Sequence, residues 1–441
     1  MLAYGKQCIG KDDIAAVVAA LKSDYLTTGP EVEAFEQEFA EMIGAKHAVA
    51  VNNATAALHL AMLVAGIGQG ERVVTSPNTF LSSANCAAFV GATPDFADID
   101  PATYNLCPQQ LEANWKDDTK AVIAVAYAGL PCDMPAIAEI ARKRGAIVIE
   151  DGCHGPGGGF IHDGKFYKIG AHPWADITTF SFHPVKTMTT GEGGMLVTDN
   201  DAYAARARLL RSHGITRDSD TFGVFKEQGT GARKQEAGNV SQKNSAPCSP
   251  LFRRGPWTYE MQILGYNYRI TDIQCALGRS QLKKLSDFIL RRQEIFDQYN
   301  SAFQDLEWLD TPKDGGWCVL DSDKNDLSKA IFYSPSETTD AMRPIVSQHL
   351  YTVQIDFEAL GKSRNEVMAK LRDQGIGTQV LYIPVYLQPW YQQNYGYGEG
   401  KCPNAEAYYL KSLSLPLYSA MMDADVEHVI KVVRQTAHSG C

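Results

Sequence analysis

The chain has 441 residues, and 41 Lys and Arg against 51 Asp and Glu give it a formal net charge of −10. Apolar residues make up 45% and charged residues 21%, which is enough to bury a large core and excludes a disordered chain. The acidic balance argues against a general binder of nucleic acid or of an anionic membrane surface, and the length predicts two or three domains.

The first 200 residues alternate apolar strand patterns with amphipathic helical patterns. Helices are predicted at 12–21, 30–43, 54–65, 81–90, 108–115 and 134–144. Strands are predicted at 47–51, 72–75, 94–97, 121–126, 146–150, 177–182 and 195–198. This order requires crossover connections, so we expect an α/β fold with a mostly parallel mixed sheet that is covered on both faces.

The second half is less regular. Residues 217–254 are polar and lack periodicity, which is typical of a lid, an interface arm or a disordered insertion, and 312–347 are similarly irregular. A helix at 272–303, strands at 350–355 and 378–382, and helices at 364–374 and 423–437 predict a smaller α+β domain. We therefore divide the chain into a large domain, 1–260, and a small C-terminal domain, 261–441.

Cysteine usage and hydropathy favour a cytoplasmic protein. The ten cysteines form no CxxC pair, and the first residues carry no apolar stretch typical of a secretory signal. No run of 18 uncharged apolar residues predicts a membrane span. No His or Cys cluster has the spacing of metal ligands, so no metal site is expected.

The sharpest chemical signal is Lys186, which follows the predicted strand at 177–182 and stands five residues after Ser181. Burial at the end of a strand lowers the pKa of a lysine and frees its neutral amine for Schiff-base chemistry. A lysine taken alone would more often be a solvated turn residue. The residues that accompany Lys186 in the sequence favour the Schiff-base interpretation instead.

Asp151 directly follows the predicted strand at 146–150, and His154 stands three residues further on. A carboxylate there can receive a protonated pyridine nitrogen, and the histidine can contact the phenolic oxygen of the same ring. As plain structural residues they would be a helix cap and a buried histidine.

Two further patterns complete this group. The start of the predicted helix at 54–65, with the Ala54 amide and the Thr55 hydroxyl, is suited to a phosphate, and Ser181 is a second hydroxyl within reach. Phe80 could stack on the ring, with core packing as the alternative. Phosphate, stacking, ring-nitrogen and Schiff-base groups are together the needs of pyridoxal 5′-phosphate (PLP).

The chain resembles the DegT/DnrJ/EryC1/StrS family of nucleotide-sugar aminotransferases. The resemblance runs through Asn53-Ala-Thr-Ala-Ala-Leu58, Glu150-Asp151 with His154, Ser181-Phe-His-Pro-Val-Lys186 and Leu264-Gly-Tyr-Asn-Tyr-Arg-Ile-Thr-Asp-Ile273. It implies the PLP-dependent fold-type I architecture of aspartate aminotransferase. Arg211-Ser-His-Gly214 and Gly255-Pro-Trp-Thr-Tyr-Glu260 are most similar to the PseC branch, which forms UDP-4-amino-4,6-dideoxy-N-acetyl-β-L-altrosamine on the route to pseudaminic acid.

The resemblance also implies roles for single residues. Lys186 would carry the cofactor and shuttle the proton, and the amino donor would be L-glutamate. The cofactor would be bound by Ala54, Thr55, Phe80, Asp151, His154, Ser181 and Lys186. Asn267 would reach the cofactor of a neighbouring subunit, so the active sites of a homodimer would be shared. Thr28, Gly29 and Tyr382 would contact the UDP-linked 4-keto sugar.

Several alternatives remain open from the sequence. The sugar could be another 4-keto substrate, of the GDP-perosamine or bacillosamine type, or the chain could bind PLP without catalysis. Leu381 stands where the family often has a histidine, in Val-His-Tyr-x-Pro, so the pocket on that side should differ. A dinucleotide-binding or P-loop enzyme is disfavoured because both glycine motifs are absent.

Overall fold

The computed structural model describes residues 1–222, 255–312, 317–319, 331–333 and 343–436. Residues 223–254, which form most of the predicted insertion at 217–254, lie outside this described part. The same holds for most of the irregular stretch predicted at 312–347 and for residue 437 of the last predicted helix. None of the helices in the described ranges is long and apolar enough to cross a lipid bilayer.

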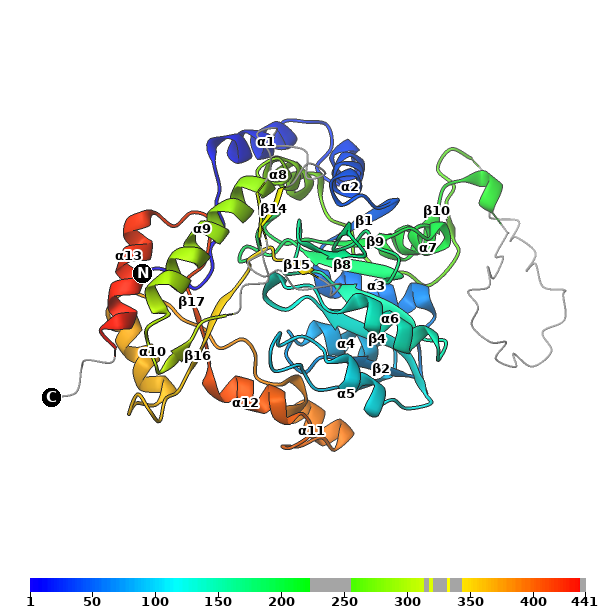
Figure 1. Cartoon of the computed structure of the whole chain (residues 1–441). Helices are drawn as coiled ribbons and strands as arrows, with labels where there is room; N and C mark the ends of the chain where they lie inside the picture. Colours follow the sequence, from blue (N-terminus) through cyan, green and yellow to red (C-terminus); the bar gives the residue numbers. More distant parts are fainter. Residues whose placement is uncertain (223–254, 313–316, 320–330, 334–342, 437–441) are drawn as a thin grey trace.

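A seven-stranded sheet forms the centre of the larger part of the molecule, in the order β1-β9-β8-β5-β4-β2-β3 (Figure 1). Strand β9 runs antiparallel to both of its neighbours, and the other strands share one direction, so the predicted mostly parallel mixed sheet is confirmed. The strands are β1 (His47–Val51), β2 (Arg72–Thr75), β3 (Thr93–Phe96), β4 (Thr119–Val125), β5 (Ile147–Asp151), β8 (Ile177–Ser181) and β9 (Gly194–Thr198).

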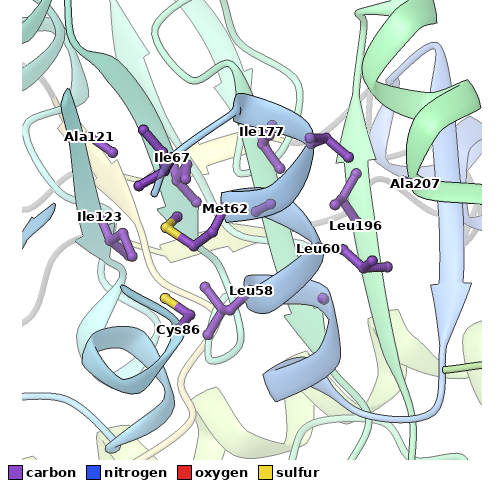
Figure 2. Close-up of a cluster of buried hydrophobic side chains, with 14 of the residues drawn as sticks. Leu58, Leu60, Met62, Ile67, Cys86, Ala121, Ile123, Ile177, Leu196 and Ala207 are labelled. Carbon is purple, nitrogen blue, oxygen red and sulfur yellow. The ribbon is translucent and has the colours of Figure 1, made fainter. Parts of the chain in front are cut away.

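Alternate residues of these strands face two different helical layers. Ile123 and Ile149 pack under α3 (Ala54–Ala65), α4 (Ser82–Phe89) and α7 (Asp201–Arg211), and Figure 2 shows Leu58 and Met62 of α3 against this face. Their neighbours Val122 and Val148 face the opposite side, towards α6 (Met134–Arg142). This two-residue period is what a sheet covered on both faces requires. The second face is completed by α2 (Pro30–Ile43), α5 (Pro108–Ala113) and α8 (Asp272–Leu282).

The helix at 272–303 was predicted as one element, and the structure divides it into α8 and α9 (Leu285–Phe303). Helix α8 packs on α1 (Lys11–Leu21) and α2. The break lies at Lys284, whose ammonium contacts Asp12 at 3.0 Å and also pairs with Asp13, both on α1. Tertiary ion pairs therefore coincide with the break between the two helices.

A second core surrounds an antiparallel sheet of β12 (Leu309–Asp310), β16 (Tyr351–Ile355) and β17 (Ser412–Leu415). Helices α9, α10 (Arg364–Asp373) and α13 (Asp423–Arg434) cover it (Figure 1). The first residues of the chain join this part, because the Leu2 amide donates to the Gly375 carbonyl at 2.7 Å and the Leu2 carbonyl accepts from Gly377 at 2.6 Å. The division of the chain at residue 260 stays a prediction.

The strand predicted at 378–382 is wrong. That segment is extended but makes only one bridge, between Gln379 and Ser414. The sequence patterns also missed β12 and β17 of the small sheet. Further missed elements are β6 (Gly159–His162), β7 (Lys165–Lys168), β10 (Ile215–Thr216), β11 (Glu260–Met261), β13 (Trp317–Val319), β14 (Ile331–Tyr333), β15 (Arg343–Ile345), α11 (Pro389–Tyr395) and α12 (Pro403–Lys411).

Candidate active site

A cavity of about 960 Å³ lies where the parallel strands of the large sheet end. Asp151 closes β5 and Ser181 closes β8, and both line the cavity. The carboxyl ends of parallel strands are the usual position of ligands in such sheets. The structure brings eight of the predicted site residues to this cavity: Ala54, Thr55, Phe80, Asp151, His154, Ser181, Lys186 and Tyr382.

One wall of the cavity is the start of helix α3. Asn53 caps this helix, because its side-chain oxygen accepts the Ala56 amide at 2.8 Å. The amides of Ala54 and Thr55 have no acceptor within the helix and so remain for an anion. The Thr55 hydroxyl lies 2.7 Å from the Ser82 hydroxyl. The chemistry of this donor set fits a phosphate group.

The backbone around this helix start is closely packed against β9. A Cβ atom added at Gly194 would lie 2.6 Å from the Ala54 nitrogen and 2.6 Å from the Asn53 carbonyl carbon. Only a residue without a side chain allows this approach, so Gly194 fixes where the amides of α3 stand relative to the sheet.

Asp151 is buried on the floor of the cavity. Its Oδ2 atom accepts the Ser83 hydroxyl at 2.7 Å, and its Oδ1 atom accepts the Cys153 amide at 3.2 Å. A carboxylate has about four acceptor positions, so positions remain for a donor inside the cavity. This arrangement fits the protonated ring nitrogen of PLP.

His154 is buried beside Asp151 and has a defined tautomer. The Ala128 amide donates to its Nδ1 atom at 3.2 Å, which leaves the proton of the neutral ring on Nε2. Burial lowers the pKa of His154 well below its usual value, and the nearby charge of Lys186 lowers it further. The Nε2 atom lies 3.5 Å from the Tyr382 hydroxyl and can act as a neutral donor to a phenolic oxygen.

Lys186 follows β8 after a four-residue segment and is half-buried in the cavity wall. Desolvation lowers the pKa of its ammonium group, and the buried guanidinium of Arg292 lowers it further. The charges of Cys153 and Asp151 act in the opposite direction but are outweighed. The neutral amine, which is the nucleophilic form, is therefore more accessible than in a solvated lysine.

Aromatic side chains form the outer wall of the cavity. Phe80 is 58% exposed, and its ring centre lies 6.3 Å from that of Tyr382. The neighbour of Tyr382, Leu381, accepts a hydrogen bond from the buried Tyr127 hydroxyl through its carbonyl oxygen. This contact holds the segment from the small sheet against the large one.

Three of the predicted residues do not line the cavity. The Gly29 amide donates to Asp272 Oδ2 at 2.7 Å, which holds the start of α2 against α8, and Thr28 precedes it with a φ of 54°. Asn267 is exposed and pairs through its backbone with Ser212. Their predicted roles towards the sugar and towards a neighbouring subunit stay predictions.

The structure also places groups at the site that the sequence patterns missed. Ser83 and Cys153 bond to Asp151, and Arg292 is 1% exposed within α9, where it donates to the carbonyls of His349 and Leu417. Burial lowers the pKa of Arg292 to about 10. Ser83 and Arg292 lie far from Lys186 in the sequence and show no motif, so no local signal could have found them.

Comparison with known proteins gives a consistent result. The sequence model of the DegT/DnrJ/EryC1/StrS aminotransferase family matches residues 7–319 and 323–434. The spore coat polysaccharide biosynthesis protein SpsC of Bacillus subtilis is 40% identical over 434 residues, 98% of this chain and 96% of SpsC.

Solved structures share the architecture. PseC of Helicobacter pylori, an aminotransferase involved in the biosynthesis of pseudaminic acid, superposes with a TM-score of 0.77 at 26% identity over 100% of both chains. Spr1654 of Streptococcus pneumoniae, solved in its PLP form, gives a TM-score of 0.76 at 25% identity over 99% of this chain and 98% of that one. These matches confirm the fold-type I prediction.

Proposed function

Because the chain belongs to the DegT/DnrJ/EryC1/StrS aminotransferase family, whose members are PLP-dependent sugar aminotransferases, we propose that it transfers the amino group of L-glutamate to C4 of a nucleotide-linked 4-keto-6-deoxyhexose. The observation that carries this proposal is the meeting of Lys186, with its lowered pKa, and the Asp151 carboxylate in one cavity. The products are 2-oxoglutarate and the 4-amino sugar.

When bound, PLP supplies an aldehyde that carries the amino group between the two substrates and a ring that accepts electrons. The amides of Ala54 and Thr55 and the hydroxyl of Ser181 would bind its phosphate. Asp151 would accept the ring N–H, and Phe80 would cover one face of the ring. These residues line the same cavity.

Lys186 and His154 would handle the protons. The Nζ atom of Lys186 would remove the proton from the α-carbon of glutamate, and it would protonate C4 of the sugar in the second half-reaction. His154 would donate from Nε2 to the phenolic oxygen, and its lowered pKa keeps the ring neutral for this role. The aromatic wall of Phe80 and Tyr382 would limit the access of water.

We propose UDP-4-amino-4,6-dideoxy-N-acetyl-β-L-altrosamine, the pseudaminic acid precursor, as the first product to test. The structural similarity to PseC supports this choice. The higher identity to SpsC, whose name refers to a spore coat polysaccharide, favours testing other 4-keto sugars beside it. Thr28, Gly29 and Tyr382 would contact the sugar in either case.

The test is an absorbance spectrum of the purified protein with PLP, recorded before and after the addition of L-glutamate. An absorbance band near the visible range that disappears when glutamate is added would support PLP as the cofactor, its linkage to Lys186 and L-glutamate as the amino donor. UDP- and GDP-linked 4-keto sugars, including the perosamine and bacillosamine types, are then added singly, and the true substrate restores the band. A protein that binds no PLP would refute the proposal, and binding without bleaching would favour a non-catalytic PLP protein.

We also propose that two copies of the chain share their active sites through Asn267. Its exposed position outside the cavity of its own chain is compatible with a reach into a partner. Inactive Lys186→Ala and Asn267→Ala proteins are unfolded together, refolded as a mixture and assayed. Shared sites would restore about a quarter of the wild-type activity, because half of the dimers are mixed and each has one intact site. No recovery would refute sharing.

A further inference from the structure

Two buried hydroxyl groups stand beside the carboxylate of Asp151. Ser83, on α4, is 1% exposed, and Thr79, in the loop before that helix, is 3% exposed. The Ser83 hydroxyl lies 2.7 Å from Asp151 Oδ2, and the Thr79 hydroxyl lies 2.8 Å from that of Ser83. The three side chains therefore form a chain of hydrogen bonds that ends at Asp151.

The direction of these bonds follows from their chemistry. An ionised carboxylate can only accept, so the single proton of the Ser83 hydroxyl points at Asp151. The oxygen of Ser83 is then left as the acceptor towards Thr79, which must donate. Each donor in such a chain polarises the next, and a bond that ends on a charged group is stronger than one between neutral groups.

The bonds restrict the Asp151 carboxylate to one orientation. The Ser83 hydroxyl, from α4, occupies one acceptor position of Oδ2. The Cys153 amide, two residues after Asp151, occupies one acceptor position of Oδ1. The remaining lone pairs are those available to a ligand in the cavity. The carboxylate is therefore an acceptor only, and the ligand atom that meets its remaining lone pairs must be the donor.

We propose that Ser83, oriented by Thr79, is a positioning residue that aims Asp151 at the ring nitrogen of PLP and keeps the shared proton on that nitrogen. This inference rests on the proposed function. Ser83 would act through Asp151 and not through a bond of its own to the reacting atoms. The hydroxyl pair thus sets how strongly the ring is held in its protonated state, which is the state that accepts electrons.

The first test measures the affinity of the apoprotein for PLP and for 1-deazapyridoxal 5′-phosphate, in which carbon replaces the ring nitrogen. Ser83→Ala should weaken PLP binding by about three- to tenfold, because Asp151 is no longer aligned with the ring N–H. Binding of the deaza analogue should be nearly unchanged, because it has no ring N–H for Asp151 to accept. An equal loss for both compounds, or no loss for PLP, would overturn the inference. If the wild-type protein binds neither compound, the proposed function fails instead.

The second test reads the proton directly. The holoprotein is loaded with ¹⁵N-labelled PLP, and the ¹⁵N chemical shift of the ring nitrogen is measured by NMR. In Ser83→Ala this chemical shift should move towards the value of the unprotonated ring. Ser83→Thr, which keeps the hydroxyl, should restore the wild-type shift, and Thr79→Val should give an intermediate one. An unchanged shift in Ser83→Ala and Thr79→Val would contradict the inference.

Thr75→Val is the matched control. Thr75 is also 1% exposed, and its hydroxyl donates to the Ile123 carbonyl, away from Asp151. The Thr75→Val protein should be less stable because it lacks this buried hydrogen bond. The ¹⁵N chemical shift of its bound PLP should stay at the wild-type value. Should Ser83→Ala fail to fold, Thr79→Val carries both measurements.

Discussion

The hydroxyl of Tyr127 donates a hydrogen bond of 2.6 Å to the carbonyl oxygen of Leu381. Tyr127 follows β4 of the large sheet and is 2% exposed, and burial raises the pKa of its hydroxyl to about 12, so it remains a donor. Its oxygen is also 2.8 Å from the Tyr408 hydroxyl. The segment that carries Tyr382 is thereby held beside the residues that follow β4, and the ring centres of Tyr127 and Tyr382 lie 6.4 Å apart.

Tyr127→Phe should lower the free energy of unfolding by about 1–3 kcal/mol, because the Leu381 carbonyl loses its buried donor. It should also raise the KM for the 4-keto sugar more than the KM for glutamate, since Tyr382 loses its support. Urea denaturation and steady-state kinetics measure the two effects. Tyr391→Phe is the control, because Tyr391 is equally buried and bonds to Asn85 at 2.6 Å. An equal rise in sugar KM for both variants would contradict the role of Tyr127.

Lys186→Ala should fold normally and lose turnover by at least about 10²–10⁴-fold, the range expected for a lost acid–base group. Lys186→Arg should be as inactive, because a guanidinium keeps the charge but has no neutral form at accessible pH. Circular dichroism verifies folding, and the release of 2-oxoglutarate from glutamate measures the reaction. Substantial turnover by either variant would remove Lys186 from its role.

The lowered pKa of Lys186 predicts how its reactivity depends on pH in the apoprotein. The neutral fraction of an amine rises as the pH passes its pKa, so labelling of Lys186 with an amine-specific reagent should begin at lower pH than labelling of exposed lysines. Asp151→Asn removes a charge that raises this pKa, so its profile should move to still lower pH. Mass spectrometry of the labelled peptide follows the rate, and a move to higher pH would contradict the electrostatic account.

Gly194→Ala should disturb the start of α3. The added Cβ would meet backbone atoms of Asn53 and Ala54, which cannot move aside as a flexible side chain can. We expect a loss of about 1–3 kcal/mol in the free energy of unfolding and weaker binding of PLP through its phosphate.

Gly68→Ala is the control for that substitution. The nearest atom to its added Cβ is the Val90 carbonyl oxygen at 3.9 Å, an ordinary contact. Denaturation and PLP titration should therefore show little change. If Gly194→Ala binds PLP as the wild type does, the position of the α3 amides does not depend on this glycine.

The sequence predicted the elements of the large sheet because local patterns and burial agree there. Strand β1 and helices α2 and α3 begin and end at the predicted residues, and Gly44 and Gly66 end the two helices with φ values of 90° and 75°. Such endings are local, because only glycine adopts this conformation readily.

The errors arose where distant contacts decide. The pattern at 272–303 contains no glycine or proline near Lys284, and the ion pairs of that lysine with α1 are not visible in the sequence. The apolar run at 378–382 resembles a strand, but its Leu381 carbonyl is taken by Tyr127. In the same way, Lys186 and Asp151 stand in recognisable motifs, whereas Ser83 meets Asp151 only after the sheet has formed.

The pairing of Leu2 with the segment Gly375–Gly377 has a consequence for biosynthesis. At typical rates of translation, roughly tens of seconds separate the emergence of these two segments from the ribosome. The residues around Leu2 therefore have no partner while the large sheet folds. Tyr4, which lines the cavity, reaches its final position only after that pairing forms. The cavity is thus completed when the segment around Leu2 pairs with Gly375–Gly377, which makes the closing of this long loop a natural final event in folding.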